Sequence, residues 1–92
     1  MALSFEWHEE KATANVKKHG VSFDEAKTVF NDPLALTIDD PKHSRAEQRF
    51  IDFGYSEQGR LLVVVYTERG DTIRLISSRK ATKSERKAYE NA

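Results

Sequence analysis

The chain has 92 residues, with 15 Lys and Arg, 15 Asp and Glu, and no cysteine. This length predicts one domain over residues 1–92, near the lower limit for folding without added covalent links. The absence of cysteine excludes disulfides and thiolate zinc sites. No apolar run has the length of a signal peptide or a membrane span, so we expect a soluble cytoplasmic protein with no membrane contact.

The two parts of the chain differ in charge although the net charge is zero. Residues 1–59 carry seven Lys and Arg against eleven Asp and Glu, a net of −4, and residues 60–92 carry eight against four, a net of +4. A basic segment on a neutral protein favours a local site for a polyanion. A merely solvated surface is the alternative, because a third of all residues are charged.

The first predicted helix covers residues 8–19. Acidic residues open it, basic residues end it, and Gly20 has the position of a C-terminal capping glycine. Its apolar stripe is narrow, with Trp7, Ala12 and Val16. Such a helix is stable only when docked, and we expect Trp7 to be the anchor.

A second helix begins after Ser22, which forms a capping-box pattern with Glu25. It ends at Pro33, because proline cannot continue the helical hydrogen bonds. One side of this helix is apolar and consists of Phe23, Ala26, Val29 and Phe30.

Four strands are predicted next, over residues 34–38, 49–55, 61–67 and 72–78. The third lacks polar alternation, which is typical of a central strand buried on both faces. The fourth alternates, so we expect one set of side chains on one face and the other set on the opposite face: Ile73, Leu75 and Ser77 against Arg74, Ile76 and Ser78.

A last helix begins at Thr82, again with a capping-box glutamate at Glu85, and continues to about Tyr89. The predicted order is α-α-β-β-β-β-α. This order indicates an α+β domain with two N-terminal helices, a four-stranded, mainly antiparallel sheet and a C-terminal helix. The first two helices would cover one face of the sheet and leave the other as a working surface.

A basic cluster is expected where the fourth strand meets the last helix. Arg79, Lys80, Arg86 and Tyr89 all lie in this segment. Arginine binds phosphate through paired hydrogen bonds, and tyrosine stacks on a base or donates its hydroxyl. The alternative is a terminal helix with solvated charges.

The histidines give a weaker signal. His19 lies at a helix C-terminus, where the dipole favours its protonated form, and serves either as a general acid or base or as a helix-end residue. No two histidines have ligand spacing, and no glycine-rich phosphate loop is present. The sequence therefore predicts no metal and no cofactor.

Several segments together resemble the BrnT-type toxins: Phe5–Trp7, Lys11, Asn15, Lys18–Ala26, Val29–Ala35, Glu47–Phe50, Gly59–Val65, Ile73–Thr82, Glu85–Arg86 and Tyr89–Glu90. The resemblance implies a RelE-like fold and a bacterial type II toxin–antitoxin ribonuclease that arrests growth. It also implies a BrnA-like antitoxin with a ribbon-helix-helix domain, a heterotetrameric complex that represses its own operon, and contact with DNA only through the antitoxin.

The chain departs from this family at two positions. The family often has aspartate where this chain has His8, so the first helix loses a good N-cap, and often has histidine where this chain has Tyr66. If the second position is catalytic, the identity of the acid or base is open.

The resemblance suggests a metal-independent endoribonuclease, in which the 2′-hydroxyl of the RNA attacks the phosphate. We expect Arg79 and Arg86 to stabilise the phosphate charge and Lys80 to position the RNA backbone. The candidates for proton transfer are His19, Glu85, Tyr66 and Tyr89. Two alternatives are a catalytically inactive module that acts through a DNA-binding partner in operon autoregulation, and a structural domain without a nucleic-acid role.

Overall fold

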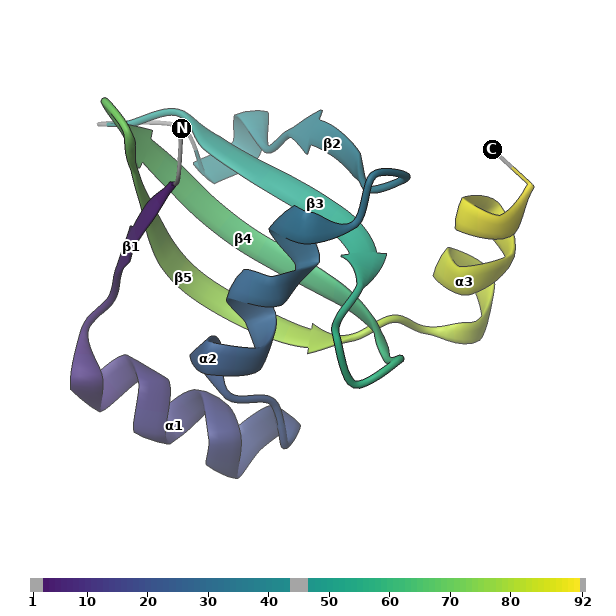
Figure 1. Cartoon of the computed structure of the whole chain (residues 1–92), viewed down its shortest axis with the longest axis horizontal. Helices are drawn as coiled ribbons and strands as arrows, with labels where there is room; N and C mark the ends of the chain where they lie inside the picture. The colour runs from purple at the N-terminus through teal and green to yellow at the C-terminus, as the bar shows by residue number, and fades with distance from the viewer. Residues whose placement is uncertain (1–2, 44–46, 92) are drawn as a thin grey trace.

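The computed structural model describes residues 3–43 and 47–91. The helices are α1 (Glu9–His19), α2 (Phe23–Ala26) and α3 (Lys83–Glu90), with two 3₁₀ turns, η1 (Lys27–Asn31) and η2 (Pro41–His43); the strands are β1 (Ser4–Glu6), β2 (Leu36–Asp39), β3 (Arg49–Tyr55), β4 (Leu61–Arg69) and β5 (Thr72–Lys80). The strands form one sheet in the order β1-β5-β4-β3-β2. Helices α1 and α2 lie against one face, and α3 stands off the end of the sheet (Figure 1).

The predicted fold class is wrong in its sheet and in its element order. The sheet has five strands and is mixed, because β1 precedes α1 and pairs in parallel with β5, with Phe5 opposite Ile73. Three residues are too few to show strand alternation, and their partner lies near the other end of the chain. The second helix is also shorter than expected, since it continues as the 3₁₀ turn η1.

The helix ends follow the local signals in part. His8 gives α1 no side-chain cap, as expected, and Gly20 ends the helix in the left-handed region with φ 68°. The hydroxyl of Ser22 accepts a hydrogen bond from the backbone N–H of Glu25 at 3.0 Å. The second half of that predicted capping box is missing, because the Glu25 carboxylate binds the guanidinium of Arg60 instead.

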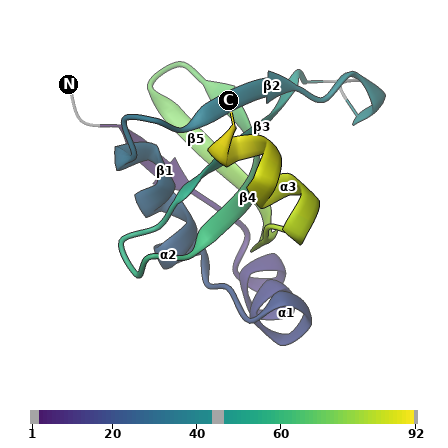
Figure 2. The same cartoon turned by 90° about the vertical axis from the view of Figure 1, so that its right-hand side faces the viewer.

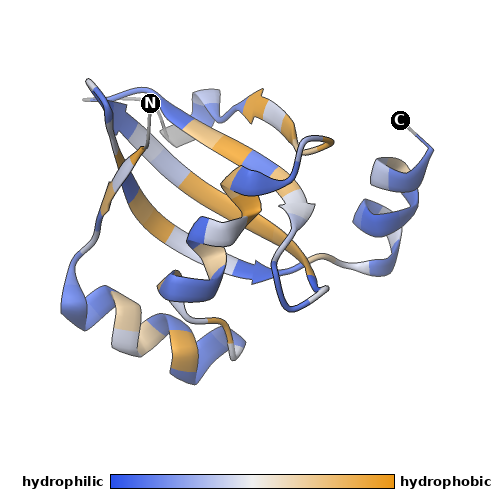
Figure 3. Ribbon diagram, viewed as in Figure 1, coloured by the Kyte–Doolittle hydropathy of each residue, from blue (hydrophilic) through white to orange (hydrophobic). Residues whose placement is uncertain are grey.

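The core lies between the sheet and the helices α1 and α2. Its buried members are Val21, Phe23, Ala26, Val29, Leu62, Val64, Tyr66, Ile73 and Leu75. The first four residues of β4 are all buried, which confirms the prediction of a central strand, and Figure 3 shows this strand as largely apolar. Trp7 docks edge-on against Phe23 with ring centroids 5.9 Å apart, which supports its predicted role as the anchor of α1.

A β-bulge changes the facing of residues along β5. Val65 of β4 lies opposite Ser77, but Tyr66 lies opposite Leu75, so β5 holds one extra residue between them. Past the bulge the facing of side chains is reversed, and Ser78 is buried on the same side as the core. The predicted alternation over residues 73–78 therefore fails beyond Leu75. Among the described helices, none is long and apolar enough to cross a membrane.

Candidate nucleic-acid interface

The C-terminal turn of α1 and the end of β5 are tied together by one side chain. The Asn15 amide donates to the carbonyl of Ser78 at 2.7 Å and accepts from the N–H of the same residue at 3.1 Å. It also donates to the carbonyl of Val21 at 2.9 Å, beyond the end of the helix. Asn15 therefore places His19, one turn later in α1, at the same corner as Lys80 at the end of β5.

Two further hydrogen bonds connect the start of β4 to the end of α1 and to the residue after β5. Arg60 donates from Nη2 to the carbonyl of Gly20 at 3.1 Å, and the backbone N–H of Ala81 donates to the carbonyl of Leu61 at 3.0 Å. Helix α3 then begins beside the corner, as Figure 2 shows with α3 nearest the viewer and α1 below it. We call the region formed by His19, Arg79, Lys80, Lys83, Arg86 and Lys87 the basic corner.

Most cations of the basic corner are available to a ligand. Lys80, Lys83, Arg86 and Lys87 are exposed, and their side chains make no hydrogen bond or ion pair with any residue that the structure describes. His19 is half-buried at the end of α1. These side chains can bind a polyanion without first giving up an internal partner.

Arg79 differs from its neighbours because it is already paired. Its two terminal nitrogens donate to the two carboxylate oxygens of Glu85 at 2.7 and 2.8 Å. The same carboxylate accepts from the N–H of Thr82 at 2.8 Å, which confirms the predicted capping box of α3. These hydrogen bonds, with that from Arg79 foremost, lower the pKa of Glu85 to about 2. Glu85 is therefore ionised at neutral pH and is a weak base.

Tyr89 faces the body of the protein and not the solvent. Its hydroxyl donates to Asp32 at 3.0 Å, and its ring meets Tyr55 edge-on at 5.7 Å. Burial, followed by the Asp32 carboxylate, raises the pKa of Tyr89 to about 12. Glu85 and Tyr89 are the half-buried residues of α3, and no residue of this helix is buried. The predicted proximity of Tyr89 to Arg86 therefore does not give a shared, exposed site.

The structure does not bring Tyr66 to the basic corner. Tyr66 is 4% exposed, and its hydroxyl donates at 2.8 Å to Asp52, which also accepts from the hydroxyl of Thr37 at 2.7 Å. Its ring stacks on Phe50 and meets Phe30 edge-on. Burial raises the pKa values of both Tyr66 and Asp52. Tyr66 is thus part of a buried network in the middle of the sheet.

Two residues that hold the site together were missed from the sequence. Asn15 bonds to a residue 63 positions away, and Arg60 to a carboxylate 35 positions away. The Glu25 carboxylate also accepts from the hydroxyl of Ser56 at 2.7 Å, and the hydrogen bond from Arg60, foremost among the causes, lowers its pKa. No local pattern predicts such distant partners; the resemblance included Asn15 and Arg60 but gave neither a role.

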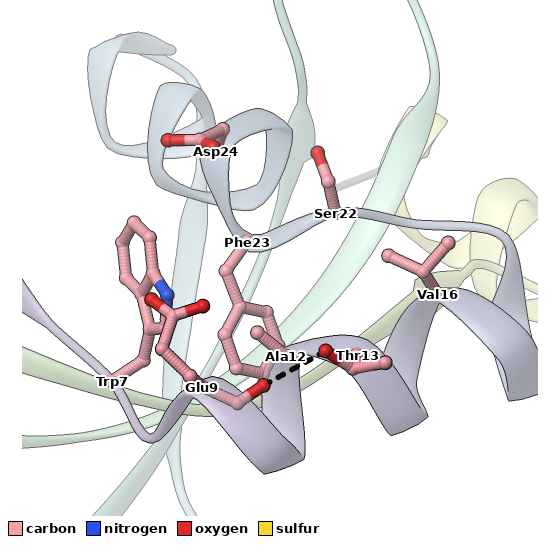
Figure 4. Close-up of a pocket in the computed structure, with 8 residues that line it drawn as sticks. All are labelled: Trp7, Glu9, Ala12, Thr13, Val16, Ser22, Phe23 and Asp24. Carbon is pink, nitrogen blue, oxygen red and sulfur yellow. Dashed lines mark hydrogen bonds between the residues drawn. The ribbon is translucent and has the colours of Figure 1, made fainter.

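A groove of about 230 Å³ lies between α1 and the start of α2 (Figure 4). Apolar side chains form part of its lining and polar or acidic ones the rest: Trp7, Ala12, Val16 and Phe23, with Glu9, Thr13, Ser22 and Asp24. Its carboxylates repel phosphate, so the groove is not an extension of the basic corner.

Comparison with known families identifies the chain. A family model described as the ribonuclease toxin BrnT of a type II toxin–antitoxin system matches residues 7–85. The chain belongs to the BrnT family. This membership confirms the resemblance noted from the sequence and implies an RNA substrate and an antitoxin partner.

A solved structure supports the same fold. The crystal structure of the Brucella abortus ribonuclease toxin BrnT superposes with a TM-score of 0.70 and 21% sequence identity, over 89% of this chain and 100% of that chain. No curated protein matches the sequence. The similarity shows that the two chains share a fold.

Proposed function

We propose that the protein is the toxin of a type II toxin–antitoxin pair, an endoribonuclease that cleaves RNA at the basic corner without a metal ion and is neutralised by a cognate antitoxin. The observation that carries this proposal is the placement of exposed cations, Lys80 and Arg86, on either side of the junction between β5 and α3 in a BrnT-family chain. His19 lies at the same corner, held there through Asn15 and its two hydrogen bonds to Ser78.

The proposed reaction is attack by the 2′-hydroxyl of the RNA on the adjacent phosphate. A base accepts the 2′ proton, an acid protonates the departing 5′ oxygen, and cations stabilise the charge that develops on the phosphate. Lys80 and Arg86 supply that charge, and His19 is assigned proton transfer because one nitrogen of a neutral imidazole accepts a proton and the other donates one.

The other candidates have weaker roles in this proposal. Glu85 is a poor base because its pKa is about 2. Tyr89 and Tyr66 already donate their hydroxyl protons to carboxylates. Arg79 stabilises a phosphate only after that phosphate has displaced Glu85 from its guanidinium. Arg79 is therefore assigned a second, exchangeable contact with the RNA.

Cleavage without a metal ion is proposed from the chemistry of the corner. Its lysines and arginines supply positive charge, and its histidine moves protons, which together meet the needs of the reaction. Among residues 3–43 and 47–91, no three His, Asp or Glu side chains converge as they do in a metal site.

The test is cleavage of a mixed-sequence RNA by the purified, partner-free protein in EDTA. We expect the wild type to shorten the RNA, and Arg86→Ala to slow cleavage by about 10²–10³-fold, the usual cost of an electrostatic donor. Lys42→Ala is the matched control, because Lys42 is an exposed cation in η2, outside the basic corner. Equal rates for Arg86→Ala and Lys42→Ala would remove the basic corner from the mechanism.

A catalytically inactive binding module is the second candidate. The pairing of Arg79 with Glu85 favours it, because one of the cations expected to act on phosphate is already neutralised. Such a module acts through a DNA-binding antitoxin in operon autoregulation. It would shift RNA in a gel without shortening it, whereas the nuclease shortens it.

A further inference from the structure

The face of the sheet opposite α1 and α2 carries two apolar rows that run across the strands. Strand register places Ile38 beside Ile51 and Ile51 beside Val65 in the first row, and Leu36 beside Phe53 and Phe53 beside Val63 in the second. Side chains directly opposite each other in a sheet point to the same face. These six residues, which we call the outer rows, face away from the core, because their neighbours Asp52, Val64 and Tyr66 face it.

The outer rows are most exposed at the edge strand β2. Ile38 is 50% exposed and Leu36 is 38% exposed, and Leu34, two residues earlier, is 73% exposed. Ile51, Phe53 and Val65 continue the rows as half-buried residues, and Val63 is buried, at 5% exposed. A contiguous exposed apolar surface on a small protein marks an interaction site, since single exposed residues carry no such meaning.

The charges around the outer rows are not symmetric. Along β4 and β5, beyond the first row, Arg74 pairs with Glu6 and Arg69 pairs with Glu47, so these charges compensate each other. Where the second row reaches β5, the residue opposite Val63 is Arg79. Beyond Arg79 is α3, whose exposed cations have no partner among the described residues. An occupant of the second row that reaches β5 therefore meets the uncompensated positive charge of α3.

The dimensions of the outer rows fit a helix. Neighbouring strands are about 4.8 Å apart, so the span from β2 to β5 is about 14 Å, the length of a helix of about ten residues. The two rows are two residues apart along each strand, which is about 7 Å and matches the apolar side of a helix about 10 Å across.

We propose that the antitoxin of this chain docks on the outer rows through an amphipathic helix that crosses the strands from β2 towards Arg79. Its apolar side covers the two rows, and acidic residues at its end beside α3 pair with Arg86 and Lys83. A helix in this position covers the part of this face that is exposed at β2 and half-buried at β3. It also neutralises the cations of the basic corner, which links docking to inhibition. The inference rests on the proposed function only in taking an antitoxin as the partner.

A second copy of the chain is a weaker occupant than the antitoxin. Strand β2 has four residues, so pairing of two β2 edges joins only a short segment of each sheet. Specific interfaces bury at least about 1,000 Å² in total, which so short an edge cannot supply alone. A longer partner that continues across the rows to α3 meets this requirement.

The test compares two substitutions at sites of equal exposure. Ile38→Asp places a charge in the outer rows, and Val16→Asp places the same charge on α1, where Val16 is 47% exposed. We expect Ile38→Asp to raise the Kd for the purified antitoxin at least about 30-fold, the cost of placing a charge in an apolar contact that carries much of the binding energy. We expect Val16→Asp to change the Kd by less than about threefold. Both variants should cleave RNA like the wild type, so this outcome is separate from the test of the nuclease.

Hydrogen exchange of the unsubstituted complex gives a second, independent measurement. Slower exchange in β2, β3 and α3 on antitoxin binding supports the proposal. Protection confined to β2, together with tight binding by Ile38→Asp, indicates addition of a strand and overturns it. Protection confined to α1 and α2 overturns it as well. A free chain that is dimeric in the wild type and monomeric as Ile38→Asp, with unchanged antitoxin binding, assigns the outer rows to a second copy.

Discussion

Two carboxylate–arginine pairs each attach a helix to the sheet, and they differ in how far the carboxylate is exposed to solvent. Between α2 and the turn before β4, the side chain of Glu25 is 3% exposed and that of Arg60 is 31% exposed. Between α3 and β5, the corresponding values are 25% for Glu85 and 39% for Arg79. The same chemistry is structural in the first pair, where the carboxylate is buried, and exchangeable in the second, where water and a phosphate can compete for both partners.

The surroundings of each pair strengthen this contrast. Helix α2 buries Phe23 and Ala26 in the core, and the carbonyl of Gly20 fixes the guanidinium of Arg60 from a second side. Helix α3 buries no residue and is attached through Glu85 and Tyr89. The rigid pair therefore positions the end of α1, and the exchangeable pair is located where the RNA is proposed to bind.

Arg60→Met should have the largest effect, because it leaves the buried carboxylate of Glu25 without a cation. We expect the free energy of unfolding to fall by about 3 kcal/mol in urea denaturation. Arg69→Met, which breaks an exposed pair with Glu47, is the control and should cost much less. Similar costs for the two variants would contradict the contrast drawn above.

The advantage of the wild type over Arg60→Met should also depend on pH. The hydrogen bond from Arg60 lowers the pKa of Glu25 below its ordinary value of 4.5. The stabilisation is therefore complete above pH 4.5 and is lost as the pH falls through the lower folded-state pKa. Urea titrations at neutral and acidic pH measure this loss directly.

Asp52→Asn sharpens the comparison by showing what burial does to a carboxylate whose hydrogen bonds with described residues come from the hydroxyls of Thr37 and Tyr66. Burial raises the pKa of Asp52, so its charged form is disfavoured in the folded protein at neutral pH. An amide oxygen can still accept from Tyr66 and Thr37, and we expect the variant to be more stable by about 1 kcal/mol.

The sign of the pH effect is opposite to that for Glu25. The gain from Asp52→Asn should be present at neutral pH and disappear as the pH falls through the raised pKa, where the wild-type carboxyl takes up its proton. Asp39→Asn, at an exposed position of β2, is the control. A gain that persists at acidic pH would show that the charge of Asp52 is not its cause.

Glu85→Gln should have the smallest effect on stability, less than about 1 kcal/mol, because the pair is half-exposed. Its effect on RNA binding should be visible, since Arg79 is released to bind phosphate. We expect the plot of log affinity against log salt to steepen by about 0.7, the value for one added phosphate contact on a single strand. Glu90→Gln, in the same helix, should leave the slope unchanged.

Elements with a strong local signal were predictable from the sequence. Gly20 ends α1, the box of Thr82 and Glu85 opens α3, and the apolar run of β4 is central. The strand β1 and the bulge in β5 were not, because the first depends on a distant partner and the second on the register between two strands.

The same division holds at the candidate site. The basic segment after β5 could be read from composition, and the structure brings Arg79, Lys80 and Glu85 together there. That Arg79 is paired with Glu85, and that Tyr66 lies in the core, depends on side-chain directions that the sequence does not fix. The partner of Arg60 is Glu25, 35 positions away, and helix or strand periodicity does not predict a contact over that separation.

The parallel pairing of Phe5 with Ile73 also sets the stage of synthesis at which the sheet can close. Contacts between the two ends of a chain form late, because a long loop must close before they contribute. During translation, β1 cannot pair until β5 has been synthesised, and Asn15 cannot bond to Ser78 before that. A nascent chain that stops before β5 therefore lacks both the closed sheet and the corner proposed to cut RNA. The closed sheet and the basic corner therefore form only after β5 has been synthesised.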